Sequence, residues 1–153
     1  MSEKKSICIN KEATHLYFIE ERFEAGLVLR GTEVKSLREG RANLKESYAK
    51  VNGDEIFLVN CHISPYSHGN QLNHDPLRSR KLLLHRREIR KLIGKVSEKG
   101  FTLVPISMYF SDGKAKLELG LGKGKKLHDK RESLKERAAN REMERAFKNK
   151  QFD

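Results

Sequence analysis

The sequence predicts a small, mainly β domain: an OB-like antiparallel β-barrel with two or three short flanking helices and a basic C-terminal tail. Two observations carry this prediction. Asn52-Gly53 and Asp112-Gly113 each lie between runs of strand-type residues, a pattern typical of β-hairpins. About six short strands with few helices suit a closed or partly closed barrel, a shape that often binds oligonucleotides. The length of 153 residues leaves room for one domain and an appendage.

The first strands are expected at residues 16–19 and 23–29, which are rich in aliphatic and aromatic side chains. The first hairpin joins residues 48–51 to residues 56–59 through Asn52-Gly53. Between these two regions, Thr32 is a suitable N-cap for a short helix over residues 33–38, and Gly40 lies just past its end.

The second hairpin joins residues 102–110 to residues 114–121. Its second arm alternates, so one side is expected to face the core and the other, with Lys116, to face water. The core-facing residues are Ala115, Leu117, Leu119 and Leu121. Pro105 within the first arm predicts an edge strand or a bulge, because proline cannot donate to a β-ladder.

A second helix is expected from Arg86 to Val96, because apolar residues recur there at the spacing of one helical face. That face consists of Ile89, Leu92, Ile93 and Val96. Arginine and lysine occupy most of the remaining surface, so the helix should present a basic side to water.

The formal net charge is +11, with 32 basic and 21 acidic residues. Such a charge favours polyanionic partners through attraction and counterion release. No segment approaches the ~20 apolar residues of a membrane span, and the N-terminus lacks the apolar core of a signal peptide. We therefore expect a cytoplasmic protein with no membrane partner. Cys8 and Cys61 form no CxxC motif and are expected to be reduced, packed thiols.

The charge divides the chain into an RNA-binding barrel over residues 1–122 and a tail over residues 123–153. The tail holds 11 basic and 6 acidic residues and no β-branched residue. Its few apolar side chains cannot offset the entropy of folding alone. On a helix, Lys130, Arg137, Arg141 and Lys148 would share one face, with Arg145 at its margin, and Ala139, Met143 and Phe147 another. We therefore expect a tail that is disordered when free and helical on a polyanion.

The search for catalytic chemistry returns little. The glycine-rich run over residues 120–126 fails as a Walker loop because Lys126 stands where Ser or Thr is required, so we read it as a flexible hinge. His68, His74 and Asp75 match no zinc spacing. Asp54, Glu55 and Asp75 could serve a nuclease but are more typical of turns. The sequence therefore predicts a protein that is not an enzyme and holds no cofactor or metal.

Aromatic and histidine side chains beside basic residues could stack on unpaired bases. These candidates are Tyr66, His68, Tyr109, Phe110 and His128. Since Tyr109 and Phe110 are adjacent in a strand, at least one of them should be core.

Several motifs resemble the SsrA-binding protein family, also called small protein B. They are YFIEE at 17–21, FEAG at 23–26, GTEVKSLR at 31–38, GNQLNHDPLRSRKLLLH from 69, LVP at 103–105, GKGKK at 122–126 and DKR at 129–131. In this order and spacing they cover essentially the whole chain. Gly122 stands where many members have alanine, which suggests added freedom at the hinge.

The resemblance implies an oligonucleotide-binding barrel without catalysis that binds the tRNA-like domain of transfer-messenger RNA (tmRNA). It also implies delivery of tmRNA to stalled ribosomes, where the tail becomes helical in the decoding centre and empty message channel. Glu24, Leu83 and Lys116 match positions that the family uses to bind the tRNA-like domain. By pattern alone Leu83 would be core, and Glu24 would repel a phosphate. An acidic residue fits an RNA site only if it orients a neighbouring base or arginine, since a carboxylate can accept a hydrogen bond from a base amino group.

The same resemblance assigns the tail motifs to ribosome rescue. The tail residues expected on ribosomal RNA are Gly124, Lys125, Lys126, His128, Asp129, Lys130, Arg131, Arg137, Arg141, Arg145 and Phe147. The implied partners are tmRNA, the small ribosomal subunit and, indirectly, the elongation factor Tu complex, with the protein itself a monomer. The alternative is a generic basic RNA-binding or ribosomal protein without a rescue role.

Overall fold

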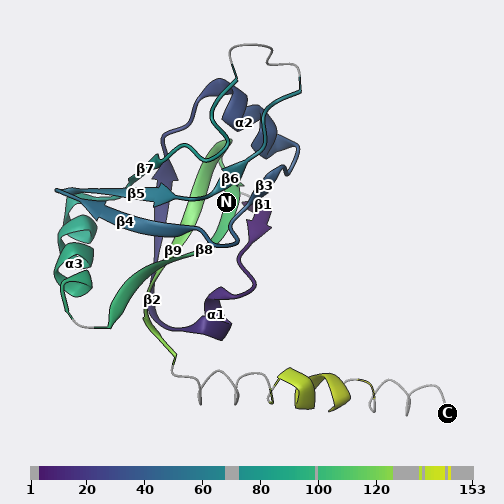
Figure 1. Ribbon diagram of the computed structural model, residues 1–153, viewed down its shortest axis with the longest axis vertical. Helices are drawn as coiled ribbons and strands as arrows, with labels where there is room; N and C mark the ends of the chain where they lie inside the picture. The colour runs from purple at the N-terminus through teal and green to yellow at the C-terminus, as the bar shows by residue number, and fades with distance from the viewer. Residues whose placement is uncertain are drawn as a thin grey trace.

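A computed structural model describes residues 4–67, 73–98, 100–125, 135, 137–143 and 145. Figure 1 shows a curved β body with the tail leaving it at the end of β9. The strands are β1 Lys4–Ile9, β2 Tyr17–Leu27, β3 Ala42–Asn43, β4 Tyr48–Asn52, β5 Glu55–Val59, β6 His62–Ile63, β7 Arg80–Leu83, β8 Phe101–Ser111 and β9 Lys114–Gly124. The helices are α1 Ala13–Leu16, α2 Gly31–Arg38 and α3 Arg86–Val96.

Seven strands form one antiparallel sheet in the order β1-β8-β9-β2-β7-β5-β4, and β3 pairs with β6 in a separate ribbon. The mainly β class with few short helices is therefore confirmed. The expected closed form of the barrel is corrected, because the two edges, β1 and β4, do not pair in the described part of the chain. β4 comes close to β8, and β3 of the ribbon comes close to β1, but among the described residues neither approach forms a ladder that joins the two edges. Leu37, Ile56, Leu58, Leu82, Leu92 and Leu117 fill the core.

Both predicted hairpins are confirmed. In the second, Asp112 and Gly113 have φ values of +52° and +74°, the pair of positive angles that a type I′ turn requires. In the first, Gly53 has a φ of +65° and the loop is residues 53–54, one residue later than expected. The two strands expected at residues 16–19 and 23–29 are one strand, β2, whose register shifts between Ile19 and Glu21. Leu16 instead ends α1, and residues 28–29 lie beyond the strand.

The two predicted helices are confirmed, and α3 has the expected bounds. The expected cap of α2 is wrong: Arg30 precedes the helix as its N-cap, and the backbone N–H of Arg30 donates to Glu33 Oε1 at 2.8 Å. The Thr32 hydroxyl instead lies 2.9 Å from His74 Nδ1. Gly40 follows the helix with a φ of +71°, as predicted.

Pro105 lies at a bulge, as predicted, where the β8–β9 register shifts between Pro105 and Ser107. β8 lies between β1 and β9, but β1 pairs only with residues 107–111, so at Pro105 the strand pairs with β9 alone. Asn10 stabilises the bulge. Its side-chain amide donates to the Pro105 carbonyl at 2.9 Å, and its backbone N–H donates to the Ile106 carbonyl at 2.8 Å.

The glycine-rich run is not a hinge as far as Gly124, because β9 continues to that residue. The missing side chains serve close packing instead. A Cβ on Gly120 would lie 2.7 Å from Ile106 Cδ1, and a Cβ on Gly122 would lie 2.8 Å from the Phe18 carbonyl oxygen. The flexible-hinge interpretation of Gly122 is therefore corrected.

The described tail residues, 135, 137–143 and 145, are helical and mostly exposed. Arg137 Nη2 donates to the Thr14 hydroxyl at 3.3 Å, which brings this segment beside α1. Met143 is 70 % exposed, so the expected apolar face is not covered by the body. Several expected tail contacts lie outside the described residues. These are Lys126, His128, Asp129, Lys130, Arg131 and Phe147. No helix in the described segments is long and apolar enough to cross a membrane.

Candidate nucleic-acid interface

Three neighbouring strands form the floor of a groove on the outer side of the sheet. Gly26 on β2 lies opposite Leu83 on β7 and opposite Lys116 on β9, so the three residues form one row across the sheet. Glu24 lies two residues along β2 and therefore points to the same side. All four line a groove of about 600 Å³, whose far wall includes His85 and Glu88 at the start of α3. Glu24, Leu83 and Lys116, distant in sequence, thus converge at one place.

The expectation that Leu83 is core is wrong, since this side chain is 51 % exposed while its neighbour Leu82 is 1 % exposed. Leucines 82 to 84 form a continuous apolar run, and in a strand only alternate residues face the core. Gly26 is a groove residue that sequence reasoning did not single out. A Cβ there would lie 3.3 Å from Leu83 Cβ, so glycine leaves the floor open between Leu83 and Lys116.

Glu24 is exposed but held in place. Tyr109 on β8 donates its hydroxyl to Glu24 Oε2 at 2.5 Å, and the Lys4 ammonium lies 5.0 Å from the centre of the Tyr109 ring. Burial, and then the hydrogen bond to Glu24, raise the pKa of Tyr109, so the phenol remains a donor at physiological pH. The second carboxylate oxygen of Glu24 has no hydrogen bond from the described residues and can accept one from a ligand.

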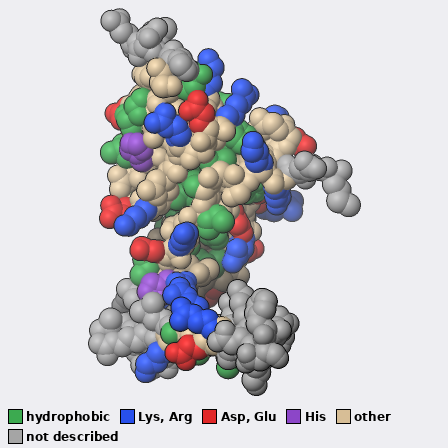
Figure 2. Space-filling view, turned by 90° about the vertical axis from the view of Figure 1, so that its right-hand side faces the viewer, with side chains coloured by type: hydrophobic (Ala, Val, Ile, Leu, Met, Phe, Trp, Pro, Cys, Tyr) green, Lys and Arg blue, Asp and Glu red, His purple; other side chains and the backbone are tan. Residues whose placement is uncertain are grey.

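Some charged residues near Glu24 are paired within the protein, and others have no ion pair there. Glu118, opposite Glu24, is occupied by Arg22 at 3.0 Å and by the Ser107 hydroxyl at 3.1 Å. Lys116 has no ion pair within the described residues. Lys114, which also lines the groove, has none either, so the groove offers two uncommitted ammonium groups beside an apolar side chain and a fixed carboxylate. Figure 2 shows lysine and arginine side chains spread over one face of the body, with a further group beside the described tail helix.

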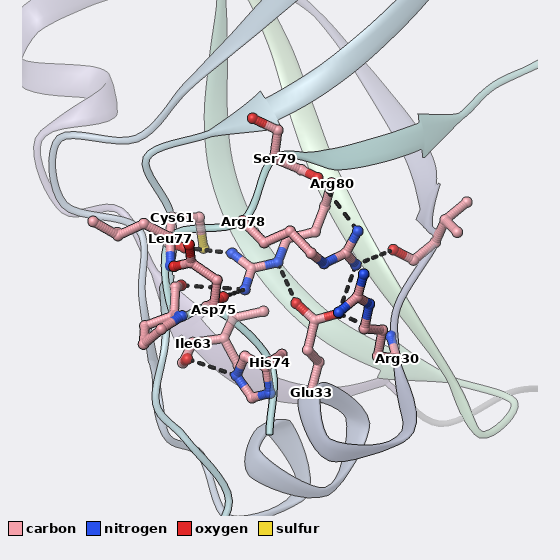
Figure 3. A network of polar contacts seen from close by, with 12 residues as sticks. Arg30, Glu33, Cys61, Ile63, His74, Asp75, Leu77, Arg78, Ser79 and Arg80 are labelled. Atoms are coloured by element: carbon pink, nitrogen blue, oxygen red, sulfur yellow. Dashed lines mark hydrogen bonds and ion pairs between the residues drawn. The ribbon is translucent and has the colours of Figure 1, made fainter. Parts of the chain in front are cut away.

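A buried ion-pair network holds β7 and hence Leu83 (Figure 3). Arg80 and Glu33 are both fully buried, and Arg80 Nε donates to Glu33 Oε2 at 2.5 Å. Arg78 Nη2 donates to Glu33 Oε1 at 2.6 Å. Arg80 also donates to the Cys61 carbonyl at 2.5 Å, which links the residue directly before β6 to β7. The network joins the first turn of α2 to β7 and so fixes the strand that carries Leu83.

Burial on its own would raise the pKa of Glu33. Hydrogen bonds from Arg78, the Arg30 backbone and Arg80, together with the charge of Arg80, outweigh it and hold the pKa below its usual range. Glu33 is therefore ionised in the folded protein, as a carboxylate that accepts only from arginines and a backbone N–H must be.

Three of the residues considered for catalysis or metal binding, His74, Asp75 and Glu55, have contacts within the protein. His74 uses both ring nitrogens, at 2.9 Å from the Thr32 hydroxyl and 2.9 Å from the Ile63 carbonyl. Asp75 accepts from the Leu77 backbone N–H at 2.9 Å, the turn contact expected of it. Glu55 lies 3.4 Å from Lys81. Within the described ranges no cluster of three or more His, Cys, Asp or Glu could hold a metal.

The two cysteines are free, and burial raises the pKa of Cys8 to about 11 and that of Cys61 to about 12. Both are protonated thiols at neutral pH, so neither is a nucleophile.

The residues predicted to stack on bases differ in their burial and contacts. Tyr109 is buried and engaged with Glu24, and Phe110 is half-buried against the core, as expected for an adjacent pair. Tyr66 carries the Lys35 ammonium 5.4 Å from its ring centre. His68 and His128 lie outside the described residues. The structure shows three further aromatic residues beside lysines, which sequence reasoning missed: the buried Phe23, and Phe18 and Phe101.

Comparison with known proteins gives a consistent result. A family model described as SmpB protein matches residues 7–149. An SsrA-binding protein of Geobacillus kaustophilus is 64 % identical over 149 residues, covering 97 % of this chain and 96 % of that protein. An SsrA-binding protein of Bacillus subtilis is 60 % identical over 147 residues, covering 96 % and 94 %. A solved chain reported under "tmRNA-SmpB: a journey to the center of the bacterial ribosome" superposes with a TM-score of 0.67 at 48 % identity. That superposition covers 83 % of this chain and 93 % of the solved one.

Proposed function

The chain belongs to the SmpB family, and we propose that the groove formed by Glu24, Leu83 and Lys116 is where it binds the tRNA-like domain of tmRNA. The protein is an SsrA-binding protein that acts with tmRNA in trans-translation, with tmRNA and the ribosome as partners. It is a non-enzymatic RNA-binding protein. The observation that carries the proposal is the convergence of three residues from distant segments on one groove.

Each side chain in the groove suits a different part of an RNA. The uncommitted ammonium of Lys116 suits a phosphate, and the half-exposed Leu83 suits the apolar face of a sugar or base. Glu24 suits a base amino group, which donates to carboxylates. Tyr109 keeps the Glu24 carboxylate oriented through its 2.5 Å hydrogen bond, so the side chain of Glu24 loses little conformational entropy when RNA binds.

The tail has a second task in this proposal. We assign residues 123–153 to the decoding centre and the empty message channel, because they carry a net charge of +5 and few apolar residues. Their contacts with ribosomal RNA would be made mainly with phosphates. β9 ends at Gly124, and the Lys125 backbone N–H donates to the Leu16 carbonyl at 2.8 Å. Gly124 and Lys125 are thus anchored to the body.

Substitution of Leu83 tests the groove, because a matched control exists. Leu83 is 51 % exposed and Leu77 is 50 % exposed, and only Leu83 lines the groove. We expect Leu83→Ala to weaken binding of the isolated tRNA-like domain about tenfold, which is roughly 1.4 kcal/mol. Leu77→Ala should leave binding unchanged. Filter binding or fluorescence anisotropy on the two variants measures the difference, and equal affinities would refute the groove as the binding site.

A further inference from the structure

A row of three residues lies at the end of the sheet opposite the groove. Phe18 on β2 and Phe101 on β8 both pair with Lys123 on β9, one on each side. Directly paired residues point to the same side of a sheet, so both rings flank the Lys123 side chain. We call these three residues the Phe18–Phe101 row.

Lysines surround both rings. The Lys123 ammonium lies 4.5 Å from the centre of the Phe101 ring, and that of Lys95 lies 5.5 Å from it. The Lys125 ammonium lies 4.9 Å from the centre of the Phe18 ring. Neither Lys123 nor Lys125 has an ion pair within the described residues, and Lys95 has only Glu98 at 3.9 Å.

Packing does not account for Phe18. Its side chain is 50 % exposed and belongs to neither hydrophobic core cluster, whereas Phe101 packs partly against the core. A half-exposed ring gains little from burial. An exposed ring beside uncommitted cations is instead the combination that stacks on an unpaired base and holds its phosphates.

The position of the row relates it to the groove. Helix α3 begins at the groove, which its N-terminal flank residue His85 lines, and its last turn brings Lys95 to Phe101. Eleven residues of helix span about 16 Å. The exposed side of this helix carries Arg86, Arg87 and Arg90. A basic surface therefore connects the groove with the row.

We propose that the Phe18–Phe101 row is a second RNA-binding site, distinct from the groove, which takes an unpaired nucleotide. The base stacks on Phe18, and the flanking phosphates contact Lys95, Lys123 and Lys125. A duplex keeps its bases stacked inside and offers no free base face, so single-stranded RNA is the class that fits. An acidic protein segment would satisfy the lysines but would not require the ring.

The test uses the full chain and a labelled single-stranded RNA of about ten nucleotides at about 50 mM salt, with fluorescence anisotropy as the readout. We expect Phe18→Leu, which keeps an apolar side chain but loses the ring, to weaken binding by about fivefold or more, as loss of one base stack does. Phe18→Tyr should bind like the unchanged protein. Tyr48, 48 % exposed and outside the row, provides the matched control: Tyr48→Leu should have no effect.

Three outcomes would overturn the proposal: Phe18→Leu binding as the unchanged protein does, Tyr48→Leu weakening binding equally, or equal affinity of the protein for a duplex of the same length. Circular dichroism shows whether each variant is folded, and Phe18→Tyr retains the ring should Phe18→Leu unfold. Leu77→Ala, at an exposed position outside the row and the groove, should leave this affinity unchanged. The row is tested with the single strand and the groove with the isolated tRNA-like domain, so failure of the row and failure of the groove give different results.

Discussion

The groove and the tail are both RNA-binding parts in our proposal, yet they use charge in different ways. Around the groove, carboxylates and cations are combined: Glu118 is paired with Arg22, Glu24 is held by Tyr109, and the groove lysines Lys114 and Lys116 have no ion pair within the described residues. The tail carries 11 basic residues with few apolar ones. A site with fixed donors, acceptors and an apolar contact can select a shape, whereas repeated basic residues bind phosphate wherever it is dense. The difference suggests that the body chooses the RNA and the tail responds to the ribosome.

The largest effect is expected from separating the two parts. Because β9 ends at Gly124 and Lys125 bonds to Leu16, deletion of residues 126–153 leaves the body intact. We expect tagging of stalled peptides to be abolished, while affinity for the isolated tRNA-like domain changes by less than about threefold, or roughly 0.7 kcal/mol. A reconstituted tagging assay and a binding assay on the same deletion measure both. Loss of tmRNA binding would end the division of labour.

The next effect compares the buried ion-pair network of the body with an exposed position of the tail, by the free energy of unfolding. Glu33→Gln leaves Arg80 buried without its anionic partner, which costs about 3–5 kcal/mol in the free energy of unfolding. Glu142→Gln, at an exposed tail position, should change that free energy by less than about 0.5 kcal/mol. Urea unfolding at constant m-value provides the measurement. A similar midpoint for both variants would show that the network does not stabilise the body.

A smaller effect concerns Lys116, the groove lysine in the same row as Gly26 and Leu83. Lys116→Ala should weaken binding of the tRNA-like domain about tenfold and reduce the slope of log K against log salt by roughly one phosphate contact. Lys50→Ala, at an exposed lysine on β4, should alter neither quantity. Titrations between about 50 and 200 mM salt measure the slope. An unchanged slope in Lys116→Ala would mean that Lys116 does not contact a phosphate.

The smallest effect is a pH dependence that belongs to the body alone. The pKa of Glu33 is lowered in the folded protein, so the unfolded chain binds its proton more readily. The stabilisation is therefore fully present above the unfolded pKa of about 4.3 and is lost as the pH falls through the folded value. Unfolding free energies measured from neutral pH down to about pH 3 should decrease less steeply for Glu33→Gln than for the unchanged protein. Parallel curves would assign the acid sensitivity to other groups.

Local chemistry let the sequence predict many elements. Asp112-Gly113 takes the two positive φ values of its turn, and α3 has the predicted bounds. The alternation of β9 is confirmed by full burial of Leu117 and Leu119. Each of these features depends on neighbours within a few residues. β1 was missed, because its lysine-rich start resembles an exposed terminus until β8 is there to pair with it.

The sequence by itself determined the turns, the helices, the mainly β class, the charge division and, through its motifs, the family. The tertiary structure alone decided that Leu83 is exposed, that Gly26 separates it from Lys116, and that Phe18 and Phe101 flank Lys123. It also decided that the sheet stays open, since β4 comes close to β8 but pairs with neither β8 nor β1 in the described residues. The physical reason is common to all of these: side-chain neighbours across a sheet depend on strand order and register. Those follow from packing between residues far apart in the chain, which no local pattern records.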